Sequence, residues 1–282
     1  MILRALSLSS LRALLHGAAA GLVLQSPAIA LSPASEKGDC SLEGATPATV
    51  MSIGADAGGD VEVTLDDGRR TTLAGLDFSS RTSTAQAVLA RWLVGRVVFV
   101  RAAPMDRWGR TPAQIFAAAT PAPTSPLISV GEAVIEAGLA RYRPGPASVP
   151  CRAHSLAAEE EARKAHAGLW GDLAMWPVDV EAQAALTELS RRKGLTLVEG
   201  VVRSVGETRN TIYLNFGHRR IGDFAVVISR RFSYKQPVSG FDPRKLIGRR
   251  VRVRGLIDTG WGPRIEIAGP EDIEIIESVR AL

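Results

Sequence analysis

Three arginines near the end of the chain alternate with valines and are suited to attract an anionic ligand. In the segment 244–255, a period of two places Arg250, Arg252 and Arg254 on one face of a strand and the valines on the other. The valines should face a core, which leaves the three positive charges exposed. Such a stripe attracts nucleic-acid phosphates. Aromatic residues that could stack on bases beside it are Tyr213, Phe216 and Trp261.

A structural interpretation of the same arginines stays open, because they could form cross-strand ion pairs with Glu266 and Glu274 or simply be solvated. The charge distribution favours an anionic partner for this part of the chain. Residues 196–282 carry 15 basic and 10 acidic side chains, whereas residues 31–170 carry 14 and 15. The positive excess therefore lies in the C-terminal third.

The first thirty residues have the layout of a secretory signal peptide. Arg4 and Arg12 precede an apolar run over 13–24, and the small residues Ala28 and Ala30 suit a signal peptidase. We expect cleavage after Ala30, with an uncleaved N-terminal anchor as the alternative. The mature protein would then be periplasmic or secreted, without a membrane segment.

The chain contains two cysteines, Cys40 and Cys151, which exclude a disulfide-dense scaffold and a four-cysteine zinc module. In the oxidising compartment implied by export, the two thiols can pair. We expect this disulfide to enclose most of a first domain, with two buried thiols as the alternative. Neither cysteine has a histidine at a spacing typical of catalysis or metal binding.

Alternating apolar residues around 48–50, 61–65 and 71–73, separated by glycine-containing turns, predict a three-stranded meander. A helix containing Ala85, Leu89 and Trp92 follows, and then strands at 97–100 and 114–118. Helical patterns return at 130–139 and 155–166. This order predicts a five-stranded barrel with packed helices, of the type that often carries oligonucleotide sites.

A second unit is predicted after a linker helix with its pattern over 178–193. Strands at 197–205, 211–216, 224–228, 249–257 and 264–267 suggest another small barrel of the oligonucleotide-binding type. The expected fold class is α+β, mainly β. The expected domains are a signal peptide at 1–30, a first barrel at 45–171, a linker at 172–195 and a second barrel at 196–277.

The first predicted barrel resembles the staphylococcal nuclease (thermonuclease) family over about residues 45–171. The resemblance lies in three motifs: the turn Asp106-Arg107-Trp108-Gly109-Arg110, a helix ending in Gly138-Leu139-Ala140, and a last helix ending in Gly168-Leu169-Trp170. It implies the fold deduced above and calcium-dependent hydrolysis of phosphodiester bonds. In this chemistry two carboxylates hold the cation, a glutamate acts as general base, and two arginines stabilise the transition state.

The resemblance carries over only part of that site. Asp60 and Asp77 match the two metal-binding aspartates, and Arg110 matches one arginine. Thr72 stands where the family has its other arginine, and Ser80 stands where it has the glutamate. Nearby residues that could replace the lost groups are Arg69, Arg70 and Arg81 for the arginine and Glu62 or Asp67 for the base.

Losing a general base typically lowers a rate by about 10² to 10⁴-fold, and losing a charge-stabilising donor lowers it by about 10² to 10³-fold. We therefore expect a catalytically degenerate, exported nuclease-like protein that binds single-stranded DNA, RNA or a protein partner. Two alternatives stay open: an active calcium-dependent nuclease with a rearranged site, and an interaction module of the cell envelope.

Overall fold

The computed structural model describes residues 40–78, 81–106, 109–218, 222–229, 241–260, 262–267, 269 and 272–276. The predicted signal peptide lies outside these residues, as do Ser80, Trp108 and Trp261. In the part of the chain that the structure describes, no helix is long and apolar enough to cross a membrane.

The first sheet closes into a five-stranded barrel, as expected. Its strands are β1 (Thr46–Ala55), β2 (Val61–Leu65), β3 (Arg70–Leu73), β5 (Val97–Ala102) and β6 (Pro112–Ala118). Neighbours pair in the order β3-β2-β1-β5-β6, and a parallel pairing of β3 with β6 closes the ring. The short strand β7 (Leu127–Ser129) pairs with β6 outside the ring. The fold is mixed α and β.

Alternation along the strands builds the barrel core. In β2, Val61, Val63 and Leu65 are buried while the residues between them are partly exposed. The turn before β3 contains Gly68 with a φ of 82°, a conformation that glycine adopts without strain. The tight Asp-Asp-Gly connection thus holds β2 and β3 in the register that the apolar pattern requires.

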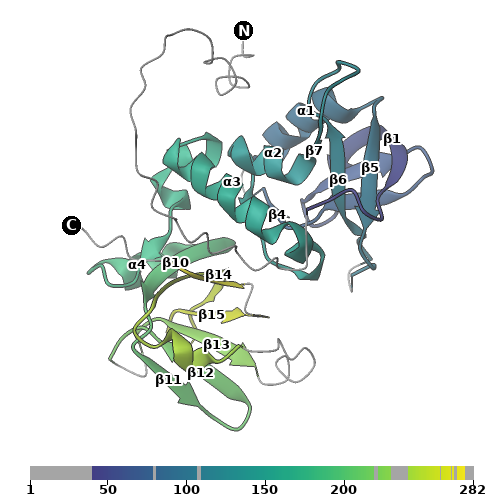
Figure 1. The fold of residues 1–282 in the computed structure, drawn as a ribbon. Helices are drawn as coiled ribbons and strands as arrows, with labels where there is room; N and C mark the ends of the chain where they lie inside the picture. The colour runs from purple at the N-terminus through teal and green to yellow at the C-terminus, as the bar shows by residue number, and fades with distance from the viewer. Residues whose placement is uncertain are drawn as a thin grey trace, which may run out of the picture. The chain divides into compact units, whose positions relative to one another are not determined.

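Helices α1 (Thr82–Leu93) and α2 (Val130–Glu136) pack on the barrel strands, and α3 (Arg152–Lys164) packs on α2 (Figure 1). The side-chain oxygen of Ser129 accepts a hydrogen bond from the N–H of Glu132 and caps α2. The helix α2 packs on β6 and on α3. This arrangement brings the loop after α2 next to the end of α3.

Two of the glycine motifs meet in space. The carbonyl of Gly138 accepts a hydrogen bond of 2.8 Å from the N–H of Leu169. A Cβ at Gly138 would lie 2.1 Å from the carbonyl oxygen of Ala167, and one at Gly168 would lie 2.2 Å from that of Gly138. Both positions therefore require glycine, and the contact places the strand that follows α2.

That strand is β8 (Arg141–Tyr142), which pairs with the equally short β4 (Leu76–Asp77) in a separate two-stranded sheet. Arg141 lies directly opposite Asp77 in this pairing. The next residue, Arg143, donates its backbone N–H to the carbonyl of Gly75 at 2.8 Å. The pairing thus brings Arg141 to Asp77 and places Arg143 beside Gly75.

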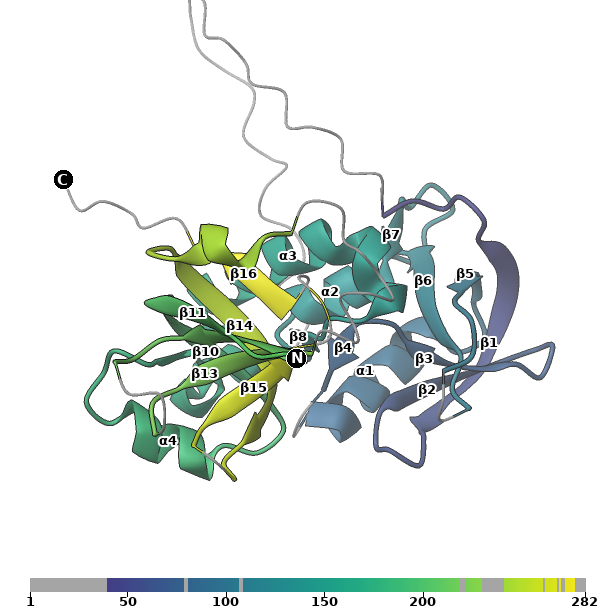
Figure 2. The same ribbon diagram turned by 90° about the horizontal axis from the view of Figure 1, so that it is seen from below.

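The C-terminal part forms one eight-stranded sheet, here called the second sheet (Figure 2). It consists of β9 (Val178–Asp179), β10 (Leu195–Val201), β11 (Ser204–Glu207), β12 (Thr211–Asn215), β13 (Ala225–Ser229), β14 (Arg250–Asp258), β15 (Arg264–Ile267) and β16 (Ile273–Ile275). Its apolar core is distinct from that of the barrel.

The region between the barrel and the second sheet differs from the predicted linker helix. Helix α4 spans Ala185–Arg191, which is shorter than the pattern over 178–193. Val178 and Asp179 instead form β9, which pairs in parallel with β10. Edge pairing with the second sheet overrides the helical pattern at this point. Short 3-10 helices precede it: η2 (Pro146–Cys151), η3 (Gly168–Gly171) and η4 (Leu173–Met175).

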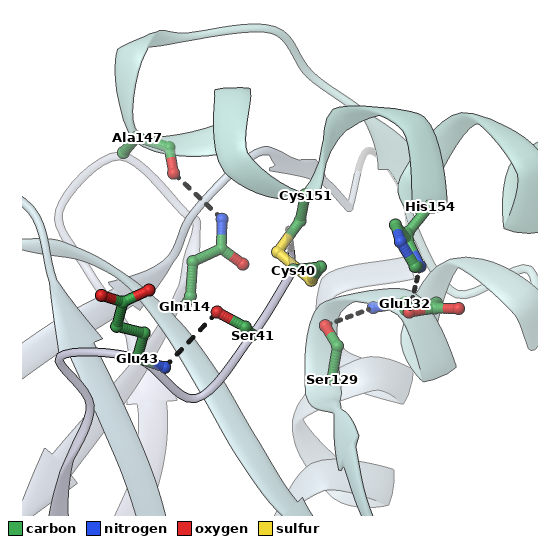
Figure 3. The surroundings of a disulfide bond; sticks show 9 residues. All are labelled: Cys40, Ser41, Glu43, Gln114, Ser129, Glu132, Ala147, Cys151 and His154. Atoms are coloured by element: carbon green, nitrogen blue, oxygen red, sulfur yellow. Dashed lines mark hydrogen bonds and ion pairs between the residues drawn. A yellow bond between two sulfur atoms is a disulfide. The ribbon is translucent and has the colours of Figure 1, made fainter. Parts of the chain in front are cut away.

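Cys40 and Cys151 form a disulfide, as expected, with their Cα atoms 4.5 Å apart (Figure 3). Cys40 precedes β1 and Cys151 ends η2, directly before α3. The bond therefore ties the start of the barrel to its last helix. Cys40 also lines a shallow hollow that contains Phe116, Glu132 and His154.

Candidate functional site

Asp60 is the centre of a group of charged side chains at the start of β2. Its Oδ2 accepts hydrogen bonds from Nη1 of Arg110 at 3.1 Å and from Nη2 of Arg143 at 2.8 Å. The Arg110 and Arg143 side chains are 28% and 38% exposed, respectively. Two guanidinium groups from distant parts of the chain thus meet at one carboxylate oxygen.

The turn before Asp60 is built by Asp56. Its Oδ1 accepts hydrogen bonds of 2.8 Å from the backbone N–H groups of Gly58 and Asp60. Gly59 has a φ of 82°, which lets the chain reverse within a few residues. This local geometry directs the Asp60 side chain toward the arginines.

Arg110 is fixed by its own turn as well as by Asp60. Asp106 accepts hydrogen bonds from the backbone N–H of Arg110 at 3.0 Å and from its Nε at 2.8 Å. Burial works against the charge of Arg110, but the hydrogen bond and the negative charge of Asp106 raise the pKa of Arg110 above its ordinary value. Arg110 is therefore permanently charged and held in one orientation.

Asp77 has a different partner. Its Oδ2 accepts a hydrogen bond of 2.8 Å from Nη2 of Arg141, whose side chain is buried. The same nitrogen donates to the carbonyl of Leu195 in β10 at 2.7 Å. Asp60 and Asp77, the two predicted metal ligands, are thus each bound to arginines that β8 and its next residue supply.

Thr72, which the resemblance places at the position of the family's second arginine, contributes no charge. It is buried, its N–H donates to the carbonyl of Thr111, and it pairs with Glu62 on one side and Pro112 on the other. It therefore belongs to the closure of the barrel. Ser80, which the resemblance places at the position of the family's glutamate, lies outside the described residues.

Four of the residues suggested as replacements for the family's arginine and glutamate form ion pairs with one another. Arg69 binds Asp67 at 2.6 Å, and Arg70 binds Glu62. Arg81 is exposed at the N-cap of α1. These contacts engage both suggested bases in ion pairs at the β2–β3 hairpin.

The carboxylates of the site do not form the donor set of a calcium ion, which takes six to eight oxygen ligands. Asp60 and Asp77 each offer a carboxylate, but the Oδ2 atom of each is already bound to a guanidinium group. In the described ranges, no three residues among His, Cys, Asp and Glu come together as a metal site. The residues present do not fit calcium.

The predicted arginine stripe on β14 is engaged in ion pairs. Arg250 binds Asp179 at 2.8 Å and Glu181 at 2.9 Å, and Arg252 binds Glu199 at 2.7 Å. These contacts agree with the cross-strand alternative, although the partners are mainly on β9 and β10.

Arg254 differs most from the expected exposed position, since its side chain is 0% exposed. It binds Glu159 at 2.7 Å and also Glu274, which the alternative interpretation named. Burial opposes its charge, but the negative charges of both glutamates outweigh burial and raise the pKa of Arg254. The stripe was expected to be exposed because alternation shows which side chains share a face and cannot show what covers that face.

Sequence reasoning missed Arg141 and Arg143 as site residues. They follow the Gly138-Leu139-Ala140 motif and alternate around a short strand, which was the available signal. The pairing of β8 with β4, which no local pattern predicts, is what brings them to the aspartates.

The model of the family described as Staphylococcal nuclease homologue matches residues 77–172. The match includes Asp77, Arg110 and Arg143 and leaves out Asp60 and Thr72. A search of curated proteins finds no match for the chain. Together with the closed five-stranded barrel, the family match supports a staphylococcal-nuclease-like domain.

Proposed function

We propose that this chain is an exported, staphylococcal-nuclease-like protein that binds single-stranded nucleic acid at Arg110 and Arg143 and hydrolyses it slowly or not at all. The convergence of these two guanidinium groups on Asp60 carries the proposal. Arg143 takes the part of the arginine that Thr72 has replaced. The proposal of export rests on the signal-peptide pattern of residues 1–30.

Phosphate binding follows from the geometry of the pair. A guanidinium group carries five N–H donors in a planar fork that matches phosphate oxygens, and Asp60 engages only part of those of Arg143. Because Asp60 and Asp106 hold the groups in place, little ordering is needed when an anion arrives. Both side chains are partly exposed, so a phosphate of an extended strand can reach them.

The affinity should be modest because carboxylates surround the pair. The group has a net charge of −1, because three carboxylates (Asp56, Asp60 and Asp106) surround two guanidinium groups (Arg110 and Arg143). Phosphate must therefore compete with Asp60 for the two arginines. Binding should be measured at low ionic strength, where the attraction between arginine and phosphate is least screened.

Weak hydrolysis is proposed because the residues that would activate water are replaced or engaged. Ser80 has no carboxylate, and the suggested bases Glu62 and Asp67 are bound to arginines. A general base contributes about 10² to 10⁴-fold to a rate. Asp60 and Asp77 are bound to arginines as well, so they do not form a calcium donor set that could take over this role.

Fluorescence anisotropy tests the binding, with the chain from residue 31 onward and labelled single-stranded DNA and RNA. We expect Arg143→Ala and Arg110→Ala each to lower the affinity for the labelled strand about 3- to 10-fold. Each change should also reduce the slope of log affinity against log salt concentration by about one, the value for one lost phosphate contact. Arg91→Ala, which changes an exposed arginine of α1, is the matched control and should bind like the wild type. Equal affinity of all four proteins would contradict the proposal.

A cleavage assay with calcium or with chelator separates the alternatives. Calcium-dependent cleavage that is lost in Asp77→Ala would identify an active nuclease with a rearranged site. Neither cleavage nor binding would favour an interaction module of the cell envelope. Binding without cleavage is the result that we expect.

A further inference from the structure

Strand β8 lies between the site and the second sheet. On one side it pairs with β4, where Arg141 faces Asp77. Arg143, two residues further, binds Asp60. Since β8 and β4 have two residues each, their mutual pairing alone is a weak constraint on these arginines. Something else must hold β8 in position.

Both backbone groups of Tyr142, the residue between the two arginines, are bound by a buried ion pair. The N–H of Tyr142 donates to Oε1 of Glu159 at 2.8 Å, and its carbonyl accepts from Nη1 of Arg254 at 2.8 Å. Arg254 and Glu159 bind each other at 2.7 Å, with side chains 0% and 2% exposed. The Arg254 guanidinium also lies 5.4 Å from the centre of the Tyr142 ring.

Glu159 belongs to α3 of the first domain, whereas Arg254 belongs to β14 of the second sheet. A second link runs from Arg141, whose Nη2 donates to the carbonyl of Leu195 at the start of β10. Leu195 pairs with Leu256, so β14 and β10 contact β8 from one connected piece of sheet. The second sheet thus supplies two of the groups that surround β8.

We propose that Arg254 is a positioning residue that holds β8 so that Arg141 and Arg143 reach Asp77 and Asp60, which makes the second sheet a necessary part of the site. The consequence for nucleic acid rests on the function proposed above. The mechanical part, that Arg254 fixes Arg141 and Arg143, can be tested without any ligand. Arg254, the fully buried member of the stripe on β14, then serves as an internal support for the site.

Removing Arg254 should loosen β8 for a definite reason. It would leave the Tyr142 carbonyl without its donor and the Glu159 carboxylate without its main counter-charge, in a place that water does not reach. Glu159 would recover a partner only if the chain moved. Because the Tyr142 backbone is bound to that same carboxylate, any such movement shifts the two flanking arginines.

The test is Arg254→Met in the chain from residue 31 onward, with Arg252→Met as the matched control. Arg252 is the neighbouring arginine of the same face, and its partners are Glu199, Glu274 and Glu160. The direct measurement is hydrogen exchange of the arginine Nε–H groups by NMR. The Arg141 signal is assigned by its absence from Arg141→Lys.

We expect the Arg141 Nε–H, whose nitrogen lies 3.3 Å from Asp77 Oδ2, to lose most of its protection in Arg254→Met and to keep it in Arg252→Met. Affinity for single-stranded nucleic acid should fall about tenfold in the first variant only. Unchanged Arg141 exchange in a folded Arg254→Met protein would overturn the proposal. Loss of protection without any wild-type binding would reject the proposed function and leave the positioning role supported.

Arg254→Lys provides a second variant in case the methionine variant does not fold. Lysine keeps the charge near Glu159 but lacks the fork that reaches Tyr142, Glu159 and Glu274 together. We expect a folded protein with intermediate loss of Arg141 protection. Wild-type protection in this variant would show that charge alone is sufficient and would contradict positioning by the guanidinium fork.

Discussion

Asp60 binds two arginines that are far apart in sequence, and only one of them, Arg110, belongs to a motif of the family resemblance. Thr72, which the resemblance places where the family has an arginine, is buried in the wall of the barrel, while Arg143 reaches Asp60 from the residue after β8. Motif comparison draws attention to Thr72 and cannot draw attention to Arg143, which lies outside the compared motifs. Residue roles in such a site depend on which side chains share a carboxylate, and motif positions alone do not decide them.

At the same scale, the Arg254–Glu159 pair predicts how stability responds to single and paired changes. Arg254→Met alone should lower the free energy of unfolding by about 3–5 kcal/mol, because it leaves a buried carboxylate unpaired. Changing Glu159 to Met as well should recover part of that loss, since two apolar side chains replace the buried pair. Urea unfolding of the two variants measures the difference. A double variant less stable than the single one would contradict this account.

Elements are placed by close backbone contacts as well as by apolar faces. The loop after α2 approaches the end of α3 so closely that Gly138 and Gly168 are in backbone contact. Two of the motifs that carry the family resemblance therefore form one structural joint. This contact fixes the position at which β8 begins. Because Arg141 is the first residue of β8, the contact also helps to position Arg141 in the site.

Gly138→Ala should therefore destabilise the protein by at least about 2 kcal/mol, through a Cβ clash with Ala167 and a φ of 65° that alanine disfavours. Gly54→Ala is a suitable control, because a Cβ at Gly54 would meet no atom within 4 Å. Thermal unfolding of both variants gives the comparison. Similar melting temperatures for the two would show that the α2–α3 contact relaxes easily.

At the scale of the whole molecule, most of the charged side chains that we expected to bind ligands form ion pairs within the chain. The aspartates expected to bind calcium are bound to arginines, and the arginines expected to bind phosphate on β14 are bound to carboxylates. In the described residues of the second sheet the charges are thus mostly paired. The arginines that we propose to bind nucleic acid are the partly exposed pair Arg110 and Arg143.

Calcium at millimolar concentration should leave the melting temperature within about 1 °C of its value in chelator, because a ligand without a site does not stabilise the folded state. Magnesium should behave in the same way. Differential scanning fluorimetry makes the measurement. A rise of several degrees with calcium that disappears in Asp60→Asn would show that the carboxylates exchange their arginines for the metal.

The sequence by itself determined the barrel, its helices and the disulfide. Local alternation, helical spacing and glycine turns act over a few residues, and they predicted the positions of β1, β2, β3, β5 and β6. Motif spacing, which is also a local property, made Asp60, Asp77 and Arg110 candidate site residues, and their roles stay predictions. The disulfide followed from the number of cysteines and the expected compartment, and the structure contains it.

Only the tertiary structure decided which charges meet. Arg143 and Asp60 are 83 positions apart, Arg254 and Glu159 are 95 apart, and no local pattern encodes either contact. Whether an arginine on a strand face is exposed or buried depends on what another element places over it. The sequence therefore indicated some candidate residues, among them Asp60, Asp77 and the β14 stripe, while packing between distant elements assigned their partners.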